Sequence, residues 1–120
     1  MNNRLIGVVG PCSAGKSTLI AGLSHYEYGA RHIAQEHSYV PDMWKRITKP
    51  DVLIFLDVSY EESMRRRPME MTEEEFDTQN QRLNHARDQA DLYINTEIFT
   101  ADDVLAQVMS YLMALDETTR

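Results

Sequence analysis

Residues 10–19 of the chain read Gly10-Pro11-Cys12-Ser13-Ala14-Gly15-Lys16-Ser17-Thr18-Leu19. They match the pattern G-x-x-x-x-G-K-[ST] in full, which is typical of a loop that binds phosphate groups. The apolar run at 5–9 predicts a buried strand before the loop, and a helix is expected to begin at Lys16. The motif therefore stands in the strand–loop–helix setting that its chemistry requires, and it predicts a P-loop nucleotide-binding protein.

The residue types of this motif fit the phosphates of a nucleoside triphosphate. Glycines at both ends let the backbone curl so that its N–H groups point at the phosphates, and the following helix adds its dipole. Lys16 would reach the β- and γ-phosphates, the Ser17 hydroxyl would ligate Mg²⁺, and Thr18 would touch the α-phosphate. We therefore expect ATP and Mg²⁺ as cofactors, with Ser17 as the metal ligand. The residues expected to contact the nucleotide are Gly10, Ser13, Ala14, Gly15, Lys16, Ser17 and Thr18.

Strand-like and helix-like segments alternate along the 120 residues, which is typical of a parallel sheet with helical crossovers. Strands are predicted at 4–9, 31–35, 51–57 and 91–95. Helices are predicted at 16–25, 41–48, 59–67 and 72–89, with a last helix that Thr100 caps. The expected fold is α/β, a three-layer α/β/α sandwich of about four parallel strands with the P-loop after the first. We expect residues 1–120 to form a single nucleotide-binding, kinase-like domain.

Two helices carry a capping signal in the sequence. Ser59 with Glu62, and Thr72 with Glu75, follow the pattern S/T-x-x-E that caps a helix N-terminus. The last helix is expected to bury one apolar stripe, because its apolar residues recur at helical spacing. That stripe consists of Val104, Leu105, Val108, Met109, Leu112 and Leu115.

Composition excludes several classes of protein. Apolar residues make up 42% of the chain and charged residues 26%, which is ordinary for a globular domain. The net charge of −7 argues against a nucleic-acid partner, whose phosphates would be repelled. No apolar run approaches the ~20 residues that cross a bilayer and no signal peptide precedes the motif, so we expect a cytoplasmic protein without a membrane partner. The single cysteine, Cys12, excludes an internal disulfide and fits a reducing compartment.

A second sequence unit follows further along the chain. Residues 50–57 read Pro-Asp, an apolar run and Leu-Asp, and residues 59–67 read Ser-Tyr-Glu-Glu-Ser-Met-Arg-Arg-Arg. This unit, and the order of the segments over most of the chain, resembles the P-loop small-molecule kinases, such as thymidylate kinase, the deoxynucleoside kinases and shikimate kinase. The resemblance implies phosphoryl transfer from ATP–Mg²⁺ to a small-molecule hydroxyl or phosphate acceptor. It also implies that the loop 96–99 meets the adenine base, mainly through its backbone.

In those kinases the helix that corresponds to 59–67 ends in a mobile lid, whose arginines close over the phosphates. Arginine suits this role because its planar guanidinium pairs with phosphate oxygens in a bidentate way and stays charged. Of the three consecutive arginines at 65–67, Arg65 or Arg66 is the expected catalytic one.

The chain departs from the kinase pattern around the acceptor. Only residues 26–30 separate the first helix from the next strand, where the relatives carry an acceptor-binding region. The lid is reduced to Arg65-Arg66-Arg67-Pro68-Met69, and Gln35-Glu36-His37 stands in place of an Asp-Arg pair. The site should therefore stay open on its acceptor side, and a second subunit that covers its mouth would make a homodimer. The nearby residues expected to line that side are Gln35, Glu36, His37, Tyr39 and Trp44.

Two carboxylates compete for the role of orienting water around Mg²⁺. Asp57 ends the clearest apolar run, whereas Glu36 follows a weaker one. In the strand order of the kinase family, the strand before Glu36 lies beside the loop and the strand before Asp57 lies on the far side of the first strand. We favour Glu36 and expect Asp57 to be structural, so the expected catalytic residues are Lys16, Glu36, Arg65 and Arg66. Trp44 is expected to pack against a helix rather than to stack on an acceptor.

Other classes of nucleotide-binding protein fit less well. A GTPase needs an N-K-x-D motif after a strand, but the similar stretch at 48–51 precedes its strand, and no D-x-x-G motif occurs. An ABC-type ATPase needs its signature segment and a far longer chain. Three functions remain open: a small-molecule kinase, which we favour, a non-catalytic nucleotide-binding or regulatory module derived from a kinase, and a slow NTPase.

Overall fold

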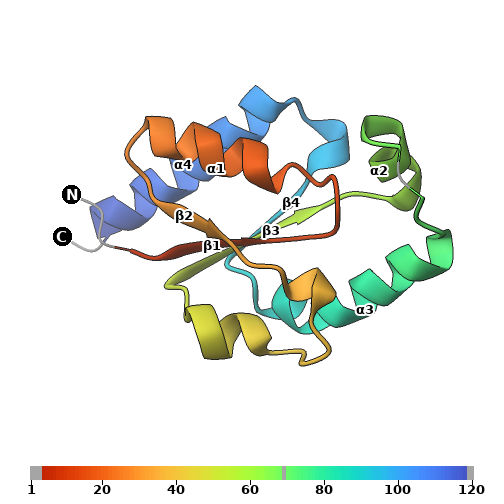
Figure 1. Cartoon of the computed structure of the whole chain (residues 1–120). Coiled ribbons are helices and arrows are strands. Elements are labelled where there is room, and N and C mark those ends of the chain that lie inside the picture. The colour runs from red at the N-terminus through yellow and green to blue at the C-terminus, as the bar shows by residue number, and fades with distance from the viewer. Residues whose placement is uncertain (1–3, 69, 119–120) are drawn as a thin grey trace.

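A parallel sheet of four strands forms the centre of the molecule (Figure 1). The computed structural model describes residues 4–68 and 70–118, so Met69, the last residue of the expected lid, lies outside the described residues. The strands are β1 (Ile6–Val9), β2 (Ala30–His32), β3 (Val52–Asp57) and β4 (Leu92–Asn95). Their order in the sheet is β2-β1-β3-β4, and every neighbouring pair is parallel. The predicted α/β class with four parallel strands is confirmed.

Helices cover both faces of the sheet (Figure 1). On one face, α1 (Lys16–His25) and α4 (Ala101–Thr118) lie side by side; on the other lies α3 (Glu73–Gln89). The short α2 (Tyr60–Arg66) follows β3 at the carboxyl end of the sheet. No helix in the described part of the chain combines the length and the apolar character needed to cross a membrane.

The core explains why β3 is apolar at almost every position. Alternate side chains of a strand point to opposite faces, and here each face meets a helix layer. Ile54 and Leu56 belong to the cluster that contains Leu23 of α1 and Leu112 of α4. Leu53 and Phe55 belong to the second cluster, with Leu83 and Ala86 of α3. Each fully buried Leu, Ile or Phe contributes about 1.5–3 kcal/mol relative to an exposed one, so the two clusters fix α1, α4 and α3 on the sheet.

The segment after β2 differs from the prediction. The expected strand at 31–35 ends at His32, and Gln35–His37 forms a 3₁₀ helix, η1. Gln35 is buried, and its amide donates to the Val40 carbonyl at 2.9 Å and accepts from the Trp44 amide at 2.8 Å. These bonds connect the Gln35 side chain to the following segment and hold η1 against it. The helix expected at 41–48 is only a π-helical segment, η2 (Trp44–Thr48).

The two predicted helix caps, Ser59 and Thr72, are confirmed. The Ser59 hydroxyl accepts from the Glu62 amide, and Thr72 and Glu75 form a full capping box. Val104, Val108 and Leu112 of the predicted stripe are buried, and its other members pack against the same cluster at partial exposure.

Candidate functional site

A cavity of about 660 Å³ opens at the carboxyl end of the sheet. The chain passes from β1 to β2 on one side of β1, whereas β3 pairs with the other side of β1, so the strand order reverses here. Open α/β sheets bind ligands at such a point. Its lining comes from the loop after β1, the start of α1, η1, the end of α2 and the segment around η3 (Thr96–Ile98). The lining residues are Cys12, Ser13, Ala14, Gly15, Lys16, Ser17, Thr18, Leu19, His32, Glu36, His37, Arg66, Arg67, Thr96, Phe99, Ala101 and Val104.

The loop 10–15 has an unusual backbone conformation. Gly10, Ser13 and Gly15 have φ angles of 154°, 64° and 102°. A Cβ on Gly10 would lie 2.1 Å from the Leu56 carbonyl oxygen, so only glycine fits against β3 at this position. Gly15 has open space around it but a positive φ, which costs an L side chain about 1–2 kcal/mol. The two glycines are thus required for different reasons.

The carbonyl groups of five consecutive loop residues all accept hydrogen bonds, four of them from groups outside the loop 10–15. Gly10 accepts from Lys16 Nζ, Pro11 from the Ala14 amide at 3.3 Å, Cys12 from Ser63 Oγ at 2.9 Å, Ser13 from Arg66 at 3.1 Å, and Ala14 from Thr96 Oγ1 at 2.9 Å. The carbonyls therefore have partners without any ligand, and the conformation of the loop is fixed in advance.

The helix start beside this loop is suited to an anion. Gly15 is the N-cap of the ten-residue α1 and makes no side-chain cap bond. The first amides of a helix have no partner within it, and the helix dipole favours negative charge there. Among the cavity-lining groups with a fixed charge, Lys16, Arg66 and Arg67 outnumber the one carboxylate, Glu36. The cavity is therefore cationic in a chain whose net charge is −7.

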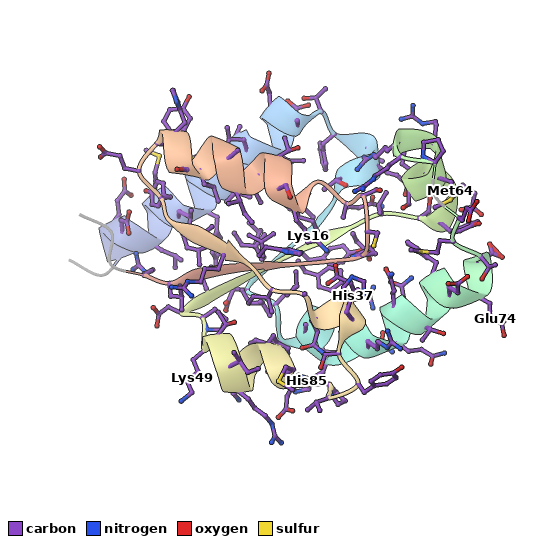
Figure 2. All side chains as sticks on the ribbon, in the orientation of Figure 1. Lys16, His37, Lys49, Met64, Glu74 and His85 are labelled. Atoms are coloured by element: carbon purple, nitrogen blue, oxygen red, sulfur yellow. The ribbon has the colours of Figure 1, made fainter. Side chains whose placement is uncertain are left out.

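Lys16 and Glu36 form an ion pair inside the cavity wall. The Nζ–Oε2 distance is 2.6 Å, and the two side chains are 7% and 3% exposed. In Figure 2 Lys16 lies between α1 and the η1 segment that carries His37. Lys16 Nζ also donates to the Gly10 carbonyl, whereas Glu36 Oε1 is buried and has no hydrogen-bond partner among the described atoms. One oxygen of this buried carboxylate therefore remains available to a ligand.

Two histidines flank the same carboxylate. Nε2 of His32 and Nε2 of His37 each lie 3.9 Å from Glu36 Oε2. Burial, followed by the nearby Lys16 ammonium, lowers the pKa of His32 and favours its neutral form. His37 is mostly exposed at the mouth of the cavity. Sequence reasoning did not single out His32, because a histidine at the end of a weak strand has no motif around it.

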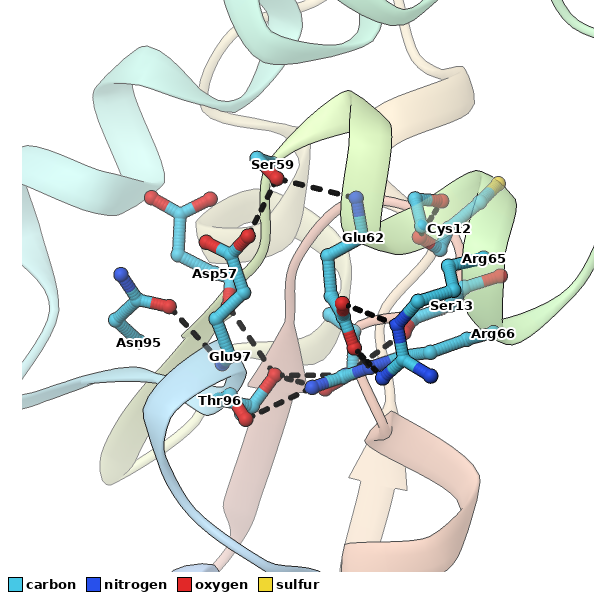
Figure 3. Close-up of polar contacts among 12 residues, drawn as sticks. Cys12, Ser13, Asp57, Ser59, Glu62, Arg65, Arg66, Asn95, Thr96 and Glu97 are labelled. Carbon is cyan, nitrogen blue, oxygen red and sulfur yellow. Dashed lines mark hydrogen bonds and ion pairs between the residues drawn. The ribbon is translucent and has the colours of Figure 1, made fainter.

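The structure separates the two expected catalytic arginines (Figure 3). Arg66 donates to the Ser13 carbonyl, to Thr96 Oγ1 at 3.0 Å and to the Thr96 carbonyl at 2.8 Å, and it lines the cavity. Arg65 is 74% exposed, pairs with Glu62, and is not among the described residues that line the cavity. Hydrogen bonds from Arg65 and then Arg66 lower the pKa of Glu62 to about 2, so this partly buried carboxylate stays charged. Arg67 lines the cavity where Arg65 does not.

Thr96 is the residue that sequence reasoning missed. The sequence predicts only a backbone contact between the loop 96–99 and a base. In the structure the Thr96 hydroxyl is buried, donates to the Ala14 carbonyl and accepts from Arg66. Its one sequence signal is its position directly after β4, at the carboxyl end of the sheet. Phe99, Ala101 and Val104 supply an apolar wall to the same cavity.

Asp57 is occupied elsewhere. Its carboxylate accepts from the Tyr93 hydroxyl at 2.6 Å and from the Val58 amide at 3.0 Å, and lies 3.4 Å from Arg87 Nε. Burial and then the hydrogen bond to Asp57 raise the pKa of Tyr93 to about 12. Asp57 lines a separate, smaller cavity of about 450 Å³, whose lining includes the start of α2 and residues of α3, and not the cavity around Lys16.

The expected acceptor side is only partly present. Glu36 and His37 line the cavity, but Gln35, Tyr39 and Trp44 are not among its described lining residues. Gln35 and Trp44 are buried, and Trp44 Nε1 donates to His85 Nδ1 of α3 at 3.1 Å, which confirms that Trp44 packs against a helix. Tyr39 is exposed, with the Arg82 guanidinium 4.4 Å from its ring centroid.

Comparison with known proteins finds no protein-family model and no curated protein that matches this chain.

Proposed function

We propose that the chain binds ATP–Mg²⁺ in the 660 Å³ cavity and transfers the terminal phosphoryl group to a small-molecule hydroxyl or phosphate. One observation carries the proposal: a loop with the full G-x-x-x-x-G-K-[ST] pattern has five successive carbonyls held by hydrogen bonds, which fixes the loop at the start of α1, where the first helix amides have no partner within the helix. Backbone amides at a helix start, with one lysine, bind phosphates even in an acidic protein. The resemblance to small-molecule kinases points to the same chemistry.

Each charged group at the cavity has a role in this proposal. Lys16 would exchange its bond to Glu36 for the β- and γ-phosphates. Arg66, already against the loop, would place its guanidinium beside the same phosphates and stabilise charge that develops during transfer. Arg67 lines the cavity and is a second candidate for this role, and the sequence-based candidate Arg65 remains a prediction.

The residues present fit a magnesium ion. Mg²⁺ prefers oxygen ligands and keeps several of its waters. The Ser17 hydroxyl lines the cavity, and Glu36 Oε1 is a buried carboxylate oxygen with no partner among the described atoms. Ser17 would bind the ion and Glu36 would hold its water shell, while the ion would neutralise charge on the phosphates.

A binding module without transfer activity is the second candidate, and a specific observation favours it. The connection between α2 and α3 is only residues 67–72, and His37 at the mouth of the cavity is mostly exposed. Closure that excludes water protects a bound nucleotide and assembles a catalytic site. Because so short a lid leaves the site open to water, slow hydrolysis of bound ATP is the third candidate function. A second copy of the chain that covers the mouth would prevent this hydrolysis.

Isothermal titration with ATP–Mg²⁺ tests the binding step. Lys16→Ala should abolish binding, whereas Lys45→Ala, which removes an exposed lysine outside the cavity, should leave it unchanged. Unchanged binding in a folded Lys16→Ala protein would remove the central claim. ADP production, measured with and without nucleosides, nucleotides and hydroxylated metabolites, then separates the kinase, the NTPase and the binding module. Sedimentation with and without nucleotide tests the homodimer.

A further inference from the structure

Three ligating side chains of different chemistry converge at the mouth of the cavity. The Cys12 sulfur, a Glu36 carboxylate oxygen and a His37 ring nitrogen all lie within 4.8 Å of one another. They come from separate places in the chain, the loop after β1 and the helix η1. Neither the expected ATP site nor the Mg²⁺ site uses the thiol or the imidazole, so the proposed function leaves this convergence without an explanation.

The donor set is that of a transition metal and not of magnesium. Zn²⁺ is bound in proteins by Cys thiolate, His imidazole and Asp or Glu carboxylate groups, whereas Mg²⁺ prefers oxygen ligands alone. The thiolate and the carboxylate would supply two negative charges to the site, of which the carboxylate charge is shared with Lys16. Three protein ligands with an open fourth position is the arrangement of zinc sites that bind water or a substrate.

The distances require little movement. Tetrahedral Zn²⁺ with bonds of 2.0–2.3 Å spaces its ligands about 3.3–3.8 Å apart. One ligand atom of each residue already lies within 4.8 Å of the other two, and the His37 side chain is 61% exposed, so its ring is free to approach. Cys12 and Glu36 belong to segments that other groups hold: Gln79 Nε2 lies 3.5 Å from the Cys12 sulfur, and Arg82 donates to the Glu36 carbonyl at 3.2 Å.

A second observation points to a ligand at the same place. Glu36 is 2% exposed, and its Oε1 atom has no hydrogen-bond partner among the described atoms. A buried carboxylate oxygen without a partner is costly, and a bound cation would remove that cost. Glu36 Oε2 can keep its bond to Lys16 while Oε1 takes the metal.

We propose that Cys12, Glu36 and His37 form a Zn²⁺ site beside the phosphate-binding loop. The site stands on these three side chains and does not depend on nucleotide binding. Its consequence does rest on the proposed function: Zn²⁺ occupies the carboxylate that Mg²⁺ needs, so Zn²⁺ antagonises the binding of ATP–Mg²⁺. The site would then act as an inhibitory metal switch on the loop.

The test uses metal-stripped full-length protein without nucleotide. Zn²⁺ is titrated in competition with a chromogenic chelator, and Co²⁺ serves as a spectroscopic substitute. We expect one Zn²⁺ per chain, and a Co²⁺–thiolate charge-transfer band that Cys12→Ser abolishes, because Cys12 is the single cysteine of the chain. Cys12→Ser and His37→Ala should each weaken Zn²⁺ binding by at least about tenfold, since even outer-shell substitutions cost 10–100-fold. His25→Ala, at the exposed end of α1, is the matched control and should bind Zn²⁺ like wild type.

The results separate the two proposals. Absence of stoichiometric Zn²⁺ binding to wild type, or retention of full affinity in either Cys12→Ser or His37→Ala, overturns the zinc site. Circular dichroism checks that each variant is folded. If Zn²⁺ binds as expected but does not weaken ATP–Mg²⁺ binding in wild type, the site stands and its inhibitory role is lost. If ATP does not bind at all, the proposed function fails and the zinc result is unaffected.

Discussion

The Lys16 ammonium and the Glu36 carboxylate form a buried ion pair at 2.6 Å, across the wall of the cavity that the phosphate-binding motif lines. Lys16 is expected to contact the phosphates of a nucleotide and Glu36 the water shell of its metal ion, yet in this structure the two side chains bind each other. Under the proposed function, an incoming phosphate would compete with Glu36 for the lysine, and Mg²⁺ would compete with Lys16 for the carboxylate. Nucleotide and metal bound together would satisfy both groups, so we expect their binding to be interdependent.

The pair should show strong energetic coupling in the protein without ligand. Lys16→Met or Glu36→Gln alone leaves one buried charge without its partner, which costs about 3–5 kcal/mol of unfolding free energy. The double variant should lose clearly less than the sum of the two single losses. Urea denaturation of the four proteins measures this coupling, and additive losses would contradict a direct interaction.

Substitutions of Glu36 and of Asp57 should affect different properties of the protein. Glu36→Gln should reduce the Mg²⁺ dependence of nucleotide binding or turnover more than Asp57→Asn, because Glu36 lines the cavity and Asp57 does not. Asp57→Asn should mainly lower the melting temperature, since it weakens the bonds to Tyr93 and Arg87. Titration calorimetry at varied Mg²⁺ and thermal melting are the measurements. The reverse pattern would mean that the two roles are exchanged.

Arg66 and Arg65 provide a matched pair on one helix. Arg66→Ala removes the partner of the Ser13 carbonyl and of Thr96, so it should weaken nucleotide binding by at least tenfold and lower the melting temperature. Arg65→Ala should change neither quantity measurably, because exposed ion pairs contribute little. Equal losses of ATP affinity in both variants would show that Arg65 also reaches the phosphates, as the kinase resemblance allows.

Thr96 should be needed for the shape of the loop. Thr96→Val keeps the volume but leaves the Ala14 carbonyl without its donor, a loss of about 1–3 kcal/mol for a buried group. We expect lower stability together with weaker ATP binding. Thr78→Val, at an exposed position of α3, is the control and should change neither. Wild-type affinity in Thr96→Val would show that the loop keeps its conformation without this bond.

Tyr93 should titrate later than an ordinary tyrosine. Its pKa is raised from 10.0 to about 12 by burial and by the bond to Asp57. Because the folded value exceeds the unfolded one, this contribution to stability is complete below pH 10 and is lost as the pH rises through 12. Ultraviolet difference titration measures the tyrosinate, and the late component should vanish in Tyr93→Phe and shift downward in Asp57→Asn. A late component that survives Tyr93→Phe would assign it to another tyrosine.

The sequence predicted the sheet and the long helices well because their signals are local. The apolar run 52–56, the N-cap residues Ser59 and Thr72 and the stripe of α4 each define an element without reference to the rest of the chain. The segment after β2 was predicted poorly, because its course depends on one buried side chain. Gln35 bonds groups five and nine residues away, and no periodic pattern signals this.

In the candidate site, too, the residues with a local sequence signal were predicted and those that depend on tertiary contacts were not. The residues from Ser13 to Thr18 line the cavity as the motif predicts, because a motif fixes its own backbone. Glu36 was inferred from its place after a strand, and it meets Lys16. The support from Thr96 and Ser63 could not be predicted, because it depends on how two distant segments dock on one loop. Single hydroxyl groups at element ends are too common in sequences to indicate such contacts.

The two glycines of the motif differ in what a substitution would disturb. At Gly10 the obstacle is the backbone of β3, so even a methyl group would wedge two adjacent strands apart. At Gly15 the obstacle is handedness alone, so asparagine, which tolerates a left-handed backbone, is a far milder replacement there. The first glycine is thus a requirement of sheet assembly in any nucleotide state. A survey of variants for growth or expression would find it intolerant even where nucleotide binding is not selected, whereas Gly15 would respond to selection for binding.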